Sequence, residues 1–339
     1  MTDNPFVVKI AIRCGLCLLS QLSPSGEFGN TSFQKNHTFH CYLHSLWVIK
    51  RSPGSLLLTH KFFIEMKTST LKTKTLNLHK IEKLMTHKTD ALTPRIIDKI
   101  FGTTVFVDED LPEFLTASRM KELHNQQIGM IAFPQITMKG IYEQFENKQS
   151  GEGLLLFDNA LELYGEETFF HEEGQRPGLC LMGMRCIPGS KGKDSLFQSL
   201  MLVDYVNYVL PELSKTVFWK DACAELKQQT PVFRNMINSA RQEETVEPIC
   251  NLEVNKYFRP RISEVFSYAT AYERHHGTRI FEDEYTLTNT VAHQPTQFVS
   301  FGIFDDDDGA NIEGIQPDYG VEGTGVSFFC SLDWLKAVI

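Results

Sequence analysis

The sequence predicts an α/β or α+β protein with a mixed sheet, in which a βαβ-type first half precedes a helical middle and an antiparallel, β-rich C-terminal part. Three observations predict this class. Short strand-like runs alternate with helix-length segments between residues 94 and 157. Segments with helical apolar periodicity follow between about residues 195 and 276. The C-terminal part then contains three runs rich in β-branched and aromatic residues, namely YTLTNTV, FVSFGIF and GVSFFCSL.

The region before the first regular element differs in character from the rest of the chain. Residues 1–65 lack a sustained helical or strand period, and lysine and arginine outnumber the acidic residues there. Residues 66–88 contain six lysines and one acidic residue, which is typical of a solvated basic arm or a targeting stretch. We therefore expect a poorly ordered N-terminal extension over residues 1–90 and a single α/β domain over residues 91–339. An alternative is that translation begins at Met66 or Met85, so that the upstream text is not part of the working protein.

The first regular signals start at Pro94. This proline opens a short helix over RIIDKIF, and Gly102 ends it, because glycine readily adopts the left-handed conformation found after helices. The run TTVFV (103–107) is a predicted strand. Asp110 is expected to cap the next helix, since its carboxylate can accept a hydrogen bond from a first-turn N–H group.

A second strand and helix complete the predicted βαβ pattern. IGMIAF (128–133) is a predicted strand, and a helix is expected from Pro134 to about Lys148. The apolar run LLLF (154–157) follows as another strand. Strands that alternate with helices at this spacing favour a mostly parallel sheet.

The middle of the chain begins with a strand and a glycine-containing loop. GLCLMGMRC (178–186) is a predicted strand, and the loop IPGSKGKDS is expected to be a flexible connection to a helix capped by Asp194 or Ser195. Phosphate could meet N–H groups at such a helix start, but the glycine spacing of a phosphate-binding loop is absent and Asp194 would repel an anion. Pro211 is expected to end this helix.

Three further helices are predicted in the middle region. They span about residues 217–228, residues 231–242 and residues 261–276. Pro231 is expected to start the second of them after the cap Thr230, and Gly277 to end the third. The C-terminal strands are expected to pair antiparallel and to complete the same sheet.

Four consecutive aspartates follow the strand-like run FVSFGIF. On an extended chain, Asp305 and Asp307 project to the same side, roughly 7 Å apart. Asp305, Asp307 and Asp308 could therefore bind one Mg²⁺, Mn²⁺ or Ca²⁺ ion through carboxylate oxygens. The alternative is a solvated acidic turn, because like charges this far apart in water repel by under about 1 kcal/mol.

Two functional hypotheses follow from the aspartates. The first is a divalent-metal-dependent enzyme for phosphoryl or glycosyl transfer or hydrolysis, in which His275 or His276 acts as acid or base. The second is a non-catalytic interaction module whose acidic turn contacts a partner. Both histidines also fit a structural role, since a helix C-terminus favours a cationic ring. The sequence does not choose between these hypotheses.

Cysteine and histidine residues suggest two other kinds of site. Cys180 and Cys186 are candidate nucleophiles by position, but their alternation with Met182 and Met184 is typical of one buried strand face. In the N-terminal extension, two cysteines and a Cys-His pair have the spacing of a zinc site, although the first pair lacks the turn residues of a zinc knuckle. The residues of this candidate zinc site are Cys14, Cys17, Cys41 and His44, with His37 and His40 nearby.

Composition excludes some classes of partner. The 42 acidic residues exceed the 33 lysine and arginine residues, and the net charge of −9 argues against nucleic acid as a partner. No segment is apolar enough for a membrane span. Scattered cysteines indicate a reducing compartment, so we expect a soluble, cytoplasmic protein that binds a small molecule or another protein.

Overall fold

The computed structural model describes nine segments of the chain. They are residues 40–41, 66–67, 91–103, 112–146, 155–176, 178–239, 241–292, 296–305 and 309–339. The chain divides into two compact units, Met1–Thr75 and Leu76–Ile339. The first unit contains strands β1 (His40–Cys41) and β2 (Met66–Lys67), which pair antiparallel. All other described elements belong to the second unit.

The second unit is rich in helices, which are spread along most of its length. The α-helices are α2 (Pro94–Phe101), α3 (Ala117–Asn125), α4 (Met138–Glu146), α5 (Asp158–Tyr164), α6 (Thr168–His171), α7 (Ser195–Val209), α8 (Val217–Ile237), α9 (Val246–Cys250), α10 (Glu253–Phe258), α11 (Ile262–His276) and α12 (Leu332–Val338). Two short 3₁₀ helices, η2 (Leu213–Lys215) and η3 (Gln242–Thr245), precede α8 and α9.

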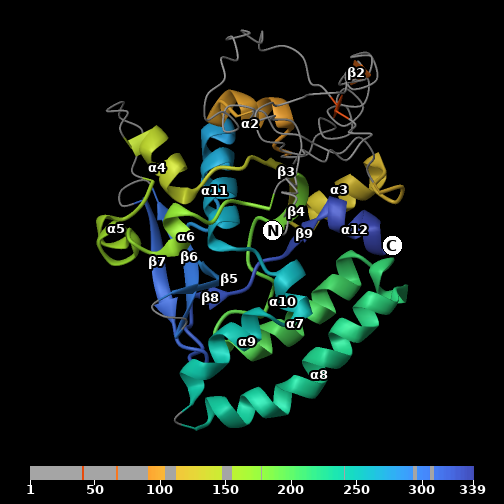
Figure 1. The fold of residues 1–339 in the computed structure, drawn as a ribbon, viewed down its shortest axis with the longest axis vertical. Coiled ribbons are helices and arrows are strands. Elements are labelled where there is room, and N and C mark those ends of the chain that lie inside the picture. The colour runs from red at the N-terminus through yellow and green to blue at the C-terminus, as the bar shows by residue number, and fades with distance from the viewer. Residues whose placement is uncertain are drawn as a thin grey trace, which may run out of the picture. The chain divides into compact units, whose positions relative to one another are not determined.

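Two sheets organise the second unit (Figure 1). The three-stranded sheet has the order β3-β4-β9, with β3 (Ile128–Phe133), β4 (Gly178–Gly183) and β9 (Phe329–Ser331). The four-stranded sheet has the order β7-β6-β5-β8, with β5 (Tyr285–Ala292), β6 (Gln297–Asp305), β7 (Gly309–Ile315) and β8 (Thr324–Gly325). This arrangement confirms the predicted mixed α/β class, the helical middle and the antiparallel C-terminal sheet.

The strands of the first half pair differently from the mostly parallel sheet that we expected. β3 and β4 are antiparallel, and so are β4 and β9. The chain between β3 and β4 explains this, because it first reaches the other sheet: Phe157 N donates to Ala310 O at 2.9 Å, and Ala310 N donates to Leu155 O at 2.9 Å. The chain then returns through α5 and α6 and enters β4 in the opposite direction.

Some of the predicted helix ends and caps match the structure and others do not. Gly102, at the end of α2, has a φ of 65°, and Gly277, at the end of α11, has a φ of 67°, both as predicted. The Asp194 carboxylate accepts from Phe197 N at 2.8 Å and caps α7, also as predicted. The helix expected after Asp110 instead begins at Ala117, where Thr116 is the cap; Asp110 and most of TTVFV lie outside the described residues.

Pro231 does not separate two helices, contrary to the prediction. It lies inside the 21-residue helix α8, and the Thr230 hydroxyl donates to Leu226 O at 2.6 Å instead of capping a new helix. Packing of α8 against α7 and α10 keeps the helix continuous (Figure 1). The buried face of α8 includes Trp219, Leu226 and Phe233.

The C-terminal segments do not all join one sheet. The expected strand GVSFFCSL contributes β9 to the three-stranded sheet, where Cys330 lies opposite Leu181 of β4. The strand beside β6 is instead β7, which the sequence did not suggest. Gly309, Gly314 and Asn311 give this segment a low intrinsic strand propensity, so pairing with β6 and not local preference makes it a strand.

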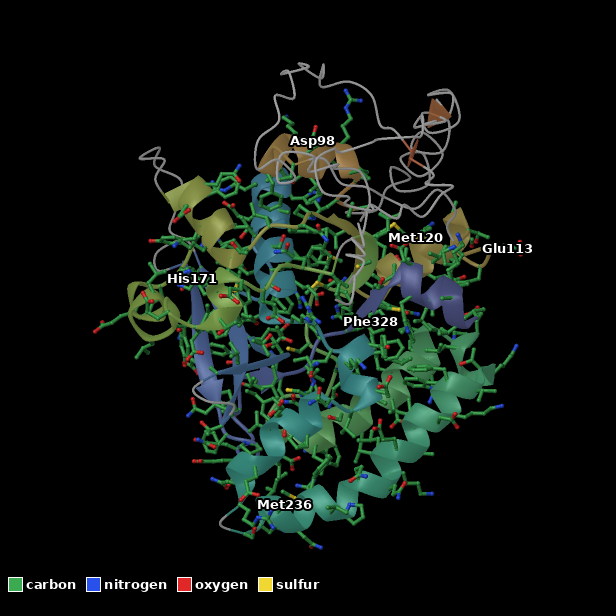
Figure 2. All side chains as sticks on the ribbon, viewed as in Figure 1. Asp98, Glu113, Met120, His171, Met236 and Phe328 are labelled. Atoms are coloured by element: carbon green, nitrogen blue, oxygen red, sulfur yellow. The ribbon has the colours of Figure 1, made fainter. Side chains whose placement is uncertain are left out.

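Helix α11 links the two sheets. Its residues from Ile262 to Ala271 are all buried, and it contacts both β3 and β6 as well as α2, α4 and α6 (Figure 1). The Phe266 ring meets the Phe301 ring of β6 with centroids 6.3 Å apart. Figure 2 places Phe328 in the interior and Glu113 at the surface, consistent with their exposures. The C-terminal histidines of α11 therefore belong to a helix that is buried from Ile262 to Ala271.

Candidate functional site

The aspartates connect two paired strands. Asp305, the last residue of β6, lies opposite Gly309, the first residue of β7, so the connection between the paired residues comprises residues 306–308. Gly309 has a φ of 76°, a left-handed conformation that favours glycine. Aspartates followed by glycine are typical of turns, because a carboxylate can accept hydrogen bonds from nearby backbone N–H groups. The acidic stretch therefore connects two paired antiparallel strands.

The strand that leads into this turn is irregular. The register between β6 and β7 shifts between Gly302 and Asp305, and Ile303 has a φ of 46°. Such a bulge bends the strand and changes the direction of the side chains that follow it. Asp305 itself is half-buried. Asp306, Asp307 and Asp308 lie outside the described residues, so the predicted set of metal ligands stays a prediction.

His275 and His276 lie together at the C-terminus of α11. Their ring centroids are 4.6 Å apart, and the His276 ring lies 4.4 Å from that of Tyr272. His276 therefore continues the apolar stripe by one turn, as its spacing suggested, while His275 is exposed. The contact with Tyr272 supports a packing role for His276.

The segment after α11 reaches the end of β6. The Arg279 guanidinium lies 4.3 Å from the ring centre of Phe304, the residue before Asp305, and Phe304 N donates to Phe281 O at 3.1 Å. Nine-tenths or more of Arg279 is buried. Residues 279–281, which follow the two histidines in the sequence, therefore contact β6, the strand that ends at the aspartates.

The cysteines whose side chains the structure describes are poor nucleophiles. Cys180, Cys186, Cys250 and Cys330 are buried, and burial raises the pKa of each thiol; for Cys250 the value is about 12. Burial also raises the pKa of the less buried Cys223 thiol, to about 11. All five are therefore protonated at neutral pH. This agrees with the interpretation of Cys180 and Cys186 as core residues.

The glycine-containing loop before α7 is held by hydrogen bonds and does not resemble the flexible connection that we expected. The Gln198 amide donates to Lys193 O at 3.0 Å and to Thr324 O at 3.2 Å. The Ser190 hydroxyl donates to Ile187 O at 2.7 Å and accepts from Val326 N at 3.1 Å. These contacts fix the loop to the β8 segment.

Glu284, a buried carboxylate that the sequence did not single out, also holds this loop. Glu284 is 5% exposed; it accepts from Cys186 N at 2.8 Å and forms an ion pair with Lys191 at 2.8 Å. Lys191 is therefore committed to Glu284 and is not available for phosphate. Glu284 belongs to the acidic run EDEY, which looks solvated in the sequence, so no local signal could have identified it.

A surface hollow of about 570 Å³ lies between the start of α8 and the end of α12. Its lining is mostly apolar and includes Val217, which is 73% exposed. The lining residues are Glu212, Lys215, Thr216, Val217, Phe218, Val338 and Ile339. The hollow contains no histidine or cysteine and one carboxylate side chain, so it offers an apolar contact surface.

The described part of the chain shows neither a metal-binding group nor a membrane-spanning helix. Within it, no group of three or more histidine, cysteine, aspartate and glutamate side chains is arranged to hold a metal ion. Within it also, no helix is both long and apolar enough to cross a membrane. The side chains of the candidate zinc site, Cys14, Cys17, Cys41 and His44, lie outside the described residues.

Comparisons with known proteins give no relative. No protein-family model, no curated protein and no solved structure matches this chain.

Proposed function

We propose that this chain is a binding protein whose acidic hairpin turn, Asp305–Asp308, contacts a basic segment of a partner protein. The pairing of Asp305 with Gly309 supports the proposal, because the aspartates stand between two paired strands in the sequence. Turns between paired strands lie at the surface, where ligand-binding residues are common. Four adjacent carboxylates in a chain of net charge −9 attract a lysine- or arginine-rich partner.

A peptide-binding measurement tests this proposal. The probe is a fluorescein-labelled, lysine- and arginine-rich peptide, and its anisotropy is followed at low salt with the full chain. Replacing Asp306, Asp307 and Asp308 together by asparagine should weaken binding about tenfold, since three surface ion pairs with the peptide at roughly 0.5 kcal/mol each amount to about the 1.4 kcal/mol of one decade. Asp305 is retained because it pairs with Gly309.

A matched control changes the same charge elsewhere. Asp221→Asn, Glu243→Gln and Glu247→Gln remove three exposed carboxylates from the helical middle. This control should alter the affinity less than about twofold if the turn is the contact. Equal weakening by the two triple variants would show that only the net charge matters, and the proposal would fail.

Divalent-metal catalysis is the second candidate function for the same turn. Asp305, Asp307 and Asp308 lie within one tight connection, and carboxylate oxygens are the ligands that Mg²⁺, Mn²⁺ and Ca²⁺ prefer. In this proposal the metal would act as a Lewis acid on a phosphoryl or glycosyl group of a small molecule. His275 or His276 would supply the acid or base, since α11 ends beside the segment that contacts Phe304.

Thermal unfolding distinguishes the second candidate from the first. Millimolar Mg²⁺, Mn²⁺ or Ca²⁺ should raise the unfolding midpoint if the turn binds the ion, and Asp305→Asn with Asp307→Asn should remove that rise. The Asp221, Glu243 and Glu247 control should retain it. An unchanged midpoint with all three ions would contradict metal binding while leaving the peptide contact open to its own test.

A further inference from the structure

Arg259 is a buried cation whose guanidinium is only partly hydrogen-bonded. It follows α10 and is 0% exposed. Its Nη2 donates to Ser195 O at 3.0 Å and to the Ser199 hydroxyl at 3.1 Å, both in the first turns of α7. Its Nε and Nη1 atoms are buried and have no acceptor. Two N–H-bearing atoms of one cation are thus left without a partner in the interior.

No carboxylate among the described residues pairs with Arg259. Glu264 accepts from Arg176 and from the backbone of Arg261, and Asp194 pairs with Arg234 at 2.7 Å. Glu173 lies 3.6 Å from the Arg261 side chain. Glu264 and Asp194 are therefore paired with other arginines.

The charge of Arg259 persists at neutral pH. Burial lowers the pKa of Arg259, but only to about 10. The neighbouring Cys250 is neutral, because burial raises the pKa of its thiol to about 12. The first turn of α7 adds the positive end of a 15-residue helix dipole. Since an isolated buried charge is strongly unfavourable, this location requires a negative partner.

We propose that the Arg259 guanidinium binds a small monovalent inorganic anion of the chloride class through Nε and Nη1. Arg259 lies at the end of α10, which contacts α7 (Figure 1). The guanidinium carbon is 5.9 Å from the centre of the Phe298 ring of β6. Complete burial of Arg259 selects a compact ion over a larger organic acid. One uncompensated positive charge matches one negative charge.

The test is the anion dependence of stability in the full chain. Unfolding midpoints are compared in sodium chloride and sodium gluconate at equal ionic strength. Chloride should raise the midpoint by about 3 °C when its concentration is roughly five times its dissociation constant. Arg259→Met should remove this difference. Arg241→Met, which changes an arginine whose side chain is 63% exposed, should retain it.

A crystallographic measurement covers the case in which Arg259→Met does not fold. Crystals of the unaltered chain soaked in sodium bromide should show an anomalous peak within hydrogen-bonding distance of Nε or Nη1. Absence of that peak would overturn the proposal. So would equal midpoints in the two salts, or a chloride effect that survives in Arg259→Met.

Discussion

Replacement of Glu264 by glutamine should strongly destabilise the protein. The Glu264 side chain is 0% exposed, and its two oxygens accept from Arg176 Nε and Nη2, each at 2.6 Å. They also accept from the backbone N–H groups of Arg176 at 3.2 Å and Arg261 at 2.8 Å. Arg176 in turn donates to Lys256 O at 2.7 Å, so the pair joins the segment before β4 to α10 and α11.

The expected loss follows from leaving Arg176 without its counter-charge. Removing one partner of a buried ion pair typically costs about 3–5 kcal/mol. With a urea slope of roughly 3 kcal/mol per molar for a chain of this size, the midpoint should fall by about 1–2 M. Urea unfolding followed by far-UV circular dichroism measures both the slope and the midpoint.

Two companion variants sharpen this test. Glu244→Gln breaks the exposed Arg241–Glu244 pair, whose side chains are 63% and 56% exposed, and should leave the midpoint unchanged. Arg176→Met with Glu264→Leu removes both buried charges and should lose less stability than Glu264→Gln alone. A loss below about 1 kcal/mol for Glu264→Gln would show that water reaches the pair and would refute the reasoning.

Three further variants test other parts of the account. Burial raises the pKa of Glu173, so the native state holds its proton more tightly than the unfolded chain, and stability falls as pH rises from about 4.3 through the folded pKa. Glu173→Gln should therefore be stabilised relative to the unaltered chain by more at pH 7 than at pH 4. Thermal unfolding at the two pH values measures this difference, and an equal gain at both would contradict the prediction. Gly302→Ala should lower the free energy of unfolding by about 1–3 kcal/mol in urea, because the added methyl group would overlap Glu284 O. Gly323→Ala should change this free energy little, since the added methyl group would meet only a Tyr285 ring atom at 3.9 Å. Equal losses in the two variants would argue against the clash. Pro231→Ala should stabilise α8 by up to about 3 kcal/mol, since it restores a backbone donor inside the helix, and a lower thermal midpoint would show that the proline fits without strain.

Local chemistry made some elements predictable. Gly102 and Gly277 end their helices because glycine adopts the left-handed conformation at low cost, and Asp194 caps α7 because its carboxylate reaches a first-turn N–H group. The aspartates before Gly309 likewise carry a turn signal, and the structure confirms that they connect paired strands. Each of these features depends on a few neighbouring residues.

Strand partners and buried charges were not predictable, because they depend on distant parts of the chain. β9 pairs with β4 across about half of the chain, and β7 becomes a strand only beside β6. The segment RPRISE looks like a solvated, charged stretch in the sequence, yet Arg259 and Glu264 within it are 0% exposed. Whether His275 and His276 approach the acidic turn is a tertiary question of the same kind.

The most direct test of the central claim, that the acidic turn is a protein-contact site, is an anomalous diffraction map of the full chain crystallised with Mn²⁺. We predict a hairpin turn between Asp305 and Gly309 whose carboxylates face solvent, with no manganese peak among them. A manganese peak coordinated by Asp305, Asp307 or Asp308, with His275 or His276 near the ion, would contradict the account and establish the turn as a metal centre.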